Sequence, residues 1–215
     1  MVQGSDGDFY GVTSGLDEVD GTILNHGTIF RMTPAGVLTT LLEFTGTEGP
    51  NLGSSPEAAL VQGSDGNFYG TTPFGGAGEQ GTIFRMTAEG VLTTLFEFGR
   101  NDNGSLPYAA LVQGNDGDFY GTTHLGGIGY GTAFKITPDG ELTTLAQFTE
   151  VEGPSSAALV QGSDGTFYGT TAEGGEDNQG TIFRMTAEGV LMTLVEFSGT
   201  GAANVGAFPD GALVL

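Results

Sequence analysis

Four copies of one sequence pattern occupy nearly the whole chain of 215 residues. Each copy begins with Gly-(Ser/Asn)-Asp-Gly-x-Phe-Tyr-Gly, continues with Gly-Thr-(Ile/Ala)-Phe-(Arg/Lys)-(Met/Ile)-Thr and ends with Leu-x-Thr-Leu-x-(Glu/Gln)-Phe. The aspartate of the first phrase recurs 48 to 59 residues apart, at Asp6, Asp65, Asp116 and Asp164. A period near fifty residues indicates a repeat architecture, in which each unit packs against its neighbours.

Each copy is predicted to form four short strands separated by turns. In the second copy the apolar and β-branched runs cover residues 60–62, 68–72, 82–87 and 91–98. The pairs Asp65-Gly66 and Glu89-Gly90 provide the positive φ that tight hairpins need. We name the strands of each copy A, B, C and D, and we expect A–B and C–D to be hairpins.

A four-stranded sheet with apolar residues on both faces must be covered on both sides, and radial stacking of blades does this. We therefore predict an all-β fold, a β-propeller of four four-stranded blades, which is either complete or half of a larger ring or assembly. A parallel β-helix is the rival, but its coils are usually shorter. The predicted single domain, 1–215, divides into blades at about 1–58, 59–109, 110–157 and 158–211, with 212–215 as a spare inner strand.

The run Gly-Ser-Asp-Gly-Asn-Phe-Tyr-Gly-Thr-Thr at residues 63–72, with the two phrases that follow it, resembles the bacterial Gloeo-Verruco tandem repeat family. The resemblance covers essentially the whole chain. It implies a secreted or cell-surface β-propeller, and it supplies no catalytic residues to transfer. We therefore expect an extracellular or cell-surface location, with any export signal absent from the chain as given.

The charge balance excludes several classes of partner. The chain has 26 acidic residues against five basic ones, a formal net charge of −21. Nucleic acid and anionic membrane surfaces would be repelled by such a chain. There is no cysteine, so disulfides and thiolate metal sites are excluded, and no apolar run is long enough to cross a membrane.

The four copies differ from one another mainly in the B–C loops and in the D–A connections. In a propeller these segments lie on one face of the disc, opposite the short A–B and C–D turns. Loops held by a rigid scaffold often carry binding residues. We therefore predict a binding surface there, formed by the two histidines and the residues outside the repeat pattern: His26, Phe74, Arg100, Tyr108, His124 and Tyr130. Sequence drift in unconstrained loops is the alternative explanation.

Two of these loops are rich in acids, which are the oxygen ligands that calcium prefers. The candidate metal ligands are Asp17, Glu18 and Asp20 in the first copy and Glu176 and Asp177 in the fourth. No established calcium-loop pattern is matched, and solvated acidic loops are the alternative. We expect no cofactor other than calcium.

The conserved polar positions of the repeat are interpreted as structural. The A–B aspartates are typical of turns, where the side chain bonds to nearby amides. Four of the five bases occupy one position in strand C, near these turns, and we expect them to pair with the turn aspartates: Arg31, Arg85, Lys135 and Arg184. The Phe-Tyr pairs of strand B alternate across the strand, so we expect one ring to pack against each adjacent blade.

The sequence contains no nucleophile elbow, zinc-protease motif or phosphate loop. The leading functional hypothesis is a non-enzymatic extracellular interaction or assembly scaffold that contacts proteins or associates with itself. One alternative is a lectin-like glycan-binding module that uses the loop aromatics. Another is a lyase or hydrolase that uses loop-face histidines and carboxylates.

Overall fold

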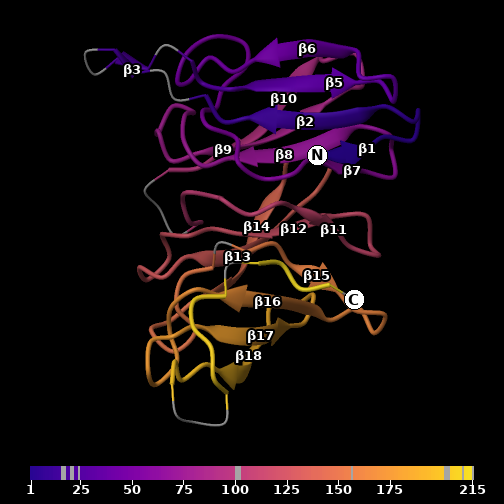
Figure 1. Ribbon diagram of the computed structural model, residues 1–215. Coiled ribbons are helices and arrows are strands. Elements are labelled where there is room, and N and C mark those ends of the chain that lie inside the picture. Colours follow the sequence, from indigo (N-terminus) through magenta and orange to yellow (C-terminus); the bar gives the residue numbers. More distant parts are fainter. Residues whose placement is uncertain are drawn as a thin grey trace.

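The computed structural model describes residues 1–15, 18–19, 22–23, 25–99, 103–155, 157–200, 204–209 and 211–214, with only the backbone of 18–19 and 22–23. These residues form strands and turns, and no helix long enough to cross a membrane occurs among them. The strands are organised in four four-stranded antiparallel sheets, one for each sequence repeat (Figure 1). The predicted all-β propeller of four blades is therefore confirmed.

The strand bounds repeat closely from blade to blade. Blade 1 contains β1 (Val2–Gln3), β2 (Phe9–Thr13), β5 (Thr28–Met32) and β6 (Leu38–Glu43). Blade 2 contains β7 (Val61–Gln62), β8 (Phe68–Thr72), β9 (Thr82–Met86) and β10 (Leu92–Glu97). Blade 3 contains β11 (Val112–Gln113), β12 (Phe119–Thr122), β13 (Thr132–Ile136) and β14 (Leu142–Gln147). Blade 4 contains β15 (Val160–Gln161), β16 (Phe167–Thr171), β17 (Thr181–Met185) and β18 (Leu191–Glu196).

The strand order within each blade is A-B-C-D, as expected for a meander. In blade 2 the observed strands lie within one residue of the predicted ones. The turn glycines Gly66 and Gly90 have φ of 83° and 91°, as the predicted hairpins require. A further short pair, β3 (Glu18–Val19) and β4 (Thr22–Ile23), lies within the first B–C segment, which was expected to be a loop.

The core lies between successive blades rather than within one blade. Three apolar clusters occur among the described residues, and they join blade 1 to blade 2, blade 2 to blade 3, and blade 3 to blade 4. We call each of these packed boundaries a joint. At every joint the strand-B tyrosine of one blade stacks on the strand-B phenylalanine of the next, which confirms the role expected for these rings. The ring centroids are 4.0 Å apart for Tyr10–Phe68, 3.9 Å for Tyr69–Phe119 and 4.1 Å for Tyr120–Phe167.

No apolar cluster of the described residues joins blade 4 back to blade 1. Figure 1 shows blades 1 and 2 in its upper half, blade 3 in the middle and blade 4 at the bottom. The four blades therefore form an open arc with two free ends. Residues 212–214, the described part of the expected spare inner strand 212–215, adopt no strand here, and Val214 is 92% exposed.

Candidate functional site

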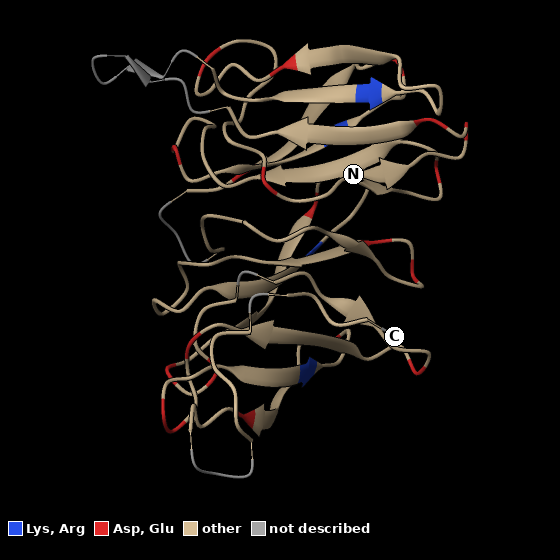
Figure 2. Cartoon of the chain, in the orientation of Figure 1, with Lys and Arg blue, Asp and Glu red and all other residues tan. Residues whose placement is uncertain are grey.

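The variable loops and connections meet on one face, as expected. The connection between blades 1 and 2 forms a two-residue bridge with the B–C loop of blade 2, where Ser54 and Phe74 exchange backbone hydrogen bonds of 2.8 and 3.3 Å. The next connection repeats this contact between Ser105 and Leu125. Each connection is thus held against the loop of the blade that it enters. Among the described residues, most acids lie in loops and turns, whereas the bases Arg31, Arg85, Lys135 and Arg184 lie in strands (Figure 2).

His26 lines a hollow between blades 1 and 2. The hollow has a volume of about 190 Å³ and is lined by His26, Gly46, Thr47, Ser54, Phe74, Gly75 and Glu79. The His26 Nδ1 atom lies 3.0 Å from the hydroxyl oxygen of buried Ser54. A side chain at Gly46 would collide with the imidazole ring, so the glycine makes room for the histidine. We call this the His26 hollow.

An aromatic row extends from this hollow across blades 2 and 3. Phe74, which is 39% exposed, meets Tyr108 edge to face with centroids 6.1 Å apart. Tyr108 meets the His124 ring in the same manner at 5.8 Å. Burial, aided by the charge of Glu57, raises the pKa of Tyr108. Four of the six predicted binding residues are therefore brought together, although they come from three different loops and one connection.

The other two predicted binding residues lie apart from this row. Tyr130 lines a second hollow, of about 400 Å³, between blades 3 and 4. Its lining residues include Glu150, Glu173, Glu176 and Asn178. Arg100 lies outside the described residues.

The predicted calcium ligands are only partly visible. Asp17 and Asp20 lie outside the described residues, and the side chain of Glu18 is not described. Glu176 and Asp177 are both exposed, and the Glu176 amide donates a 2.9 Å hydrogen bond to Glu196. Within the described part of the chain, no three carboxylate or histidine side chains are arranged to hold a metal ion. Calcium binding stays a prediction.

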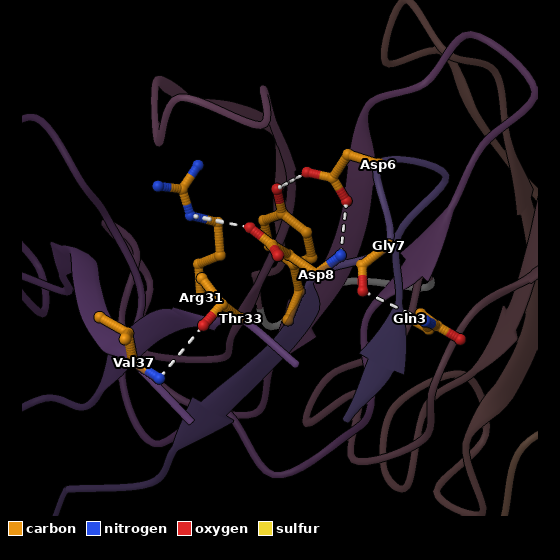
Figure 3. A network of polar contacts seen from close by, with 8 residues as sticks. Gln3, Asp6, Gly7, Asp8, Arg31, Thr33 and Val37 are labelled. Carbon is orange, nitrogen blue, oxygen red and sulfur yellow. Dashed lines mark hydrogen bonds and ion pairs between the residues drawn. The ribbon is translucent and has the colours of Figure 1, made fainter. Parts of the chain in front are cut away.

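Three of the four turn aspartates bind tyrosines rather than the bases expected as their partners. The Tyr10 hydroxyl donates a 2.8 Å hydrogen bond to Asp6, as Figure 3 shows, and Tyr69–Asp65 and Tyr120–Asp116 repeat it at 2.8 and 2.7 Å. The prediction that the turn aspartates pair directly with the strand-C bases was therefore wrong, because tyrosine hydroxyls bind Asp6, Asp65 and Asp116 instead. The tyrosine is nearer because it shares strand B with the turn. The hydrogen bond from Tyr10 lowers the pKa of Asp6.

The bases contact other groups near the same turns. Arg31 lies 3.6 Å from Asp8, and Lys135 lies 2.9 Å from Asp118, in each case the acid two residues after the turn aspartate (Figure 3). The hydrogen bond with Asp118 raises the pKa of Lys135. Arg85 instead donates to the carbonyl of Pro138 in blade 3, and Arg184 contacts the Met192 sulfur. Asp164 accepts from the Thr166 amide, which lowers its pKa.

The sequence did not identify the surfaces at the two ends of the arc. The N-terminal end surface consists of Phe9, Phe30, Met32 and Leu38, the first three half-buried and Leu38 59% exposed. At the joints, the corresponding phenylalanines, Met86, Ile136 and Met185 are buried. The C-terminal end surface consists of Tyr168, Ile182 and Phe197, all half-buried, and Leu194, which is exposed. These residues belong to the repeat pattern, but the pattern does not specify whether blade 4 packs against blade 1 to close a ring.

Solved structures of low sequence identity share this fold. A protein of unknown function from Dyadobacter fermentans matches with a TM-score of 0.56 and 13% identity, over 87% of this chain and 64% of its own. The periplasmic gluconolactonase of Pseudomonas aeruginosa matches with a TM-score of 0.51 and 15% identity, over 81% of this chain and 50% of its own. The chain therefore spans less than two thirds of either structure.

Comparison of sequences identifies a repeat family. No curated protein matches the chain in sequence. The family model of the Gloeobacter/Verrucomicrobia repeat, however, matches residues 1–215. This agrees with the resemblance noted in the repeat phrases. The chain belongs to the Gloeobacter/Verrucomicrobia repeat family.

Proposed function

We propose that the chain is a non-enzymatic extracellular scaffold that works by association, with its open arc completed by further protein. The observation that carries this proposal is the pair of uncovered end surfaces. Phe9, Phe30 and Met32 at one end, and Tyr168, Ile182 and Phe197 at the other, are half-buried, whereas the same repeat positions are buried at the joints. Exposed apolar surface of this kind marks an interaction site in a folded protein.

The proposal has a direct test in solution. The native mass of the purified chain should exceed 22.0 kDa and should rise with protein concentration, as light scattering would report. Leu38→Glu, which places a charge on the N-terminal end surface at an exposed position, should lower this mass. Val91→Glu is the matched control, because Val91 is 63% exposed but lies outside both end surfaces. A wild-type chain that stays at 22.0 kDa at every concentration would contradict the proposal.

A second candidate function is supported by the aromatic row. Edge-to-face rings beside a hollow provide flat apolar surface next to polar groups, the combination that suits a carbohydrate ring. In this lectin-like function, Phe74 and Tyr108 contact the sugar and the His26 hollow receives a substituent. A glycan array probed with the wild type and with Tyr108→Ala tests it. A saturable signal that Tyr108→Ala abolishes supports the function, and the Tyr130→Ala variant reports whether the second hollow contributes.

A further inference from the structure

The two end surfaces are complementary to each other, because they are the two halves of one joint. We propose that two copies of this chain associate head to tail, with the C-terminal end surface of each copy on the N-terminal end surface of the other, in a ring of eight blades. The inference rests on the assembly function proposed above and names the partner, a second copy. Three joints within the chain provide the template for the contact.

The first element of the template is the aromatic stack. At each internal joint a strand-B tyrosine lies on the strand-B phenylalanine of the following blade, within about 4 Å between centroids. Among the described residues, neither Tyr168 of blade 4 nor Phe9 of blade 1 takes part in such a stack. Tyr10, Tyr69 and Tyr120 are at most 1% exposed, whereas Tyr168 is half-buried. Tyr168 of one copy therefore stacks on Phe9 of the other.

The second element is a polar contact that we call the glutamine bridge. Strand A of each following blade ends in a glutamine whose side-chain oxygen accepts a hydrogen bond from a backbone amide in the A–B turn of the preceding blade. The donor–acceptor pairs are Ser5–Gln62 at 2.8 Å, Ser64–Gln113 at 2.9 Å and Asn115–Gln161 at 3.0 Å. The same glutamines donate to a turn carbonyl in their own blade, which fixes their orientation.

Gln3 makes the same hydrogen bond to its own turn, but among the described residues no turn amide of a preceding blade donates to its side-chain oxygen. Its Nε2 atom donates to the Gly7 carbonyl at 3.1 Å, and Figure 3 shows the amide oxygen pointing away from that turn. At the other end, the exposed Ser163 occupies the position of Ser5, Ser64 and Asn115. A head-to-tail contact joins these groups, with the Ser163 amide donating to the Gln3 oxygen of the second copy.

The third element is a glycine in each C–D turn that accommodates the preceding blade. A Cβ at Gly90 would lie 3.0 Å from the Leu41 carbonyl oxygen, and one at Gly140 would lie 2.9 Å from that of Leu95. Gly36 has the same place in blade 1, yet among the described residues nothing lies within 4 Å of its Cβ position. Leu194, the counterpart of Leu41 and Leu95, is 44% exposed. The open turn at Gly36 thus matches the uncovered Leu194.

The number of copies follows from blade counting. A joint between unlike surfaces repeats until it closes a ring or forms a filament. Propellers typically contain four to eight blades, and two arcs of four give eight, whereas three arcs exceed that range. The inner strand at the new joint is β1, which is already paired with β2. Residues 212–214 align with strand A of a following blade but are not paired in a strand. In the proposed contact, β1 of the second copy takes that place in their stead.

The first experiment measures the native mass of the assembly and the relative orientation of its two copies. Wild-type protein should give a mass of about 44 kDa, twice the 22.0 kDa of the chain. Because the chain has no cysteine, Gln3→Cys and Ser163→Cys can each carry one thiol for a short bismaleimide cross-linker. Neither variant should cross-link with itself, whereas an equal mixture should give a cross-linked dimer. Self-cross-linking of either variant, or a wild-type mass above that of a dimer, would overturn the inference while leaving the assembly function standing.

The second experiment blocks one end at a time. Phe9→Asp and Tyr168→Asp should each be monomeric, with the association constant reduced by more than ~100-fold, because each buries a charge at one half of every joint. An equal mixture should recover a dimer through the one joint that remains intact. Leu38→Glu and Leu194→Glu repeat the test at more exposed positions, so that it survives if an aspartate variant fails to fold. A dimer formed by one blocked variant alone would contradict the head-to-tail direction, and a monomeric wild type would contradict both proposals.

Discussion

The joints inside the arc and the surfaces at its ends are built from the same repeat positions, but their environments differ. At a joint, Phe119 is 1% exposed and stacks on Tyr69. At the N-terminal end, Phe9 has the same sequence neighbours and is half-buried without such a stack among the described residues. The same side chain is therefore core in one place and surface in another. The comparison separates the stability that a residue type provides from the stability that packing against a neighbouring blade adds.

The largest effect is expected from removing a ring at a joint. Phe119→Ala should lower the free energy of unfolding by about 3–5 kcal/mol, the usual cost of a cavity left by a buried phenylalanine. Phe9→Ala should cost under about 1.5 kcal/mol in the monomer, because its ring is only partly covered. Urea denaturation of both variants in dilute solution provides the measurement. Equal losses would show that the end surface is packed as firmly as a joint.

The second-largest effect is expected at alkaline pH, which should weaken the joints. Burial and the hydrogen bond to a turn aspartate raise the pKa of Tyr10 and Tyr69 from 10.0 to about 12. The folded state thus keeps a proton that the unfolded state releases. The resulting stability is complete below about pH 10 and is lost as the pH rises toward 12, by at most about 2–3 kcal/mol for each tyrosine, because solvent screens the exposed turn aspartates.

Urea midpoints measured across this range, together with tyrosinate absorbance, test the alkaline effect. Tyr69→Phe should reduce the loss of stability on going to high pH, because it removes one of the shifted groups. If Tyr10 and Tyr69 ionised near pH 10 while the protein stayed folded, burial and the hydrogen bonds to Asp6 and Asp65 would not be holding their protons, which would contradict this account.

The glutamine bridge should give a smaller difference between joint and end. Gln113→Ala removes the acceptor of the Ser64 amide and should cost about 1 kcal/mol. Gln3→Ala should leave the stability of the monomer nearly unchanged, since its bridge partner would come from a second copy. Thermal unfolding of both variants at low concentration gives the values. A similar loss for Gln3→Ala would mean that Gln3 stabilises blade 1 through its bond to Gly7 alone.

The smallest effect is expected from the ion pairs near the turns. Lys135→Met and Arg31→Met should each change the free energy of unfolding by under about 1 kcal/mol, because both pairs are partly exposed. Lys135→Met should have the larger effect, since its 2.9 Å contact is a hydrogen bond as well as an ion pair. The difference should shrink in high salt, and its persistence there would indicate packing rather than charge.

The sequence was most informative where one repeat position has one environment. The strands, the turn glycines and the Tyr-Phe stacks could be predicted because each depends on residues within one blade or on its nearest neighbours. Arg31 was assigned to Asp6 rather than to Asp8 because both aspartates belong to the same A–B turn segment, and the repeat pattern does not distinguish them. The choice between them depends on Tyr10, whose hydroxyl already occupies Asp6.

The candidate binding residues were predictable as a set but not as an arrangement. The variable loops identified His26, Phe74, Tyr108 and His124. Their contact depends on how each connection bridges to the next loop, as Ser54 does with Phe74. The separation of Tyr130 from the row likewise depends on loop conformations for which the repeat pattern provides no template. The open ends could not be derived, because a repeat pattern is the same in a closed ring and in an arc.

Near-identical joints also affect how the chain reaches its folded state. Because blades 1, 2 and 3 present nearly the same tyrosine, isoleucine or alanine, and phenylalanine to the following blade, a folding chain can dock a blade against the wrong neighbour at little cost in contact energy. The length of each connection then becomes the main restraint on blade order. A chain with a longer connection between blades 2 and 3 should populate misordered arcs during refolding, even though every contact in them resembles a native one.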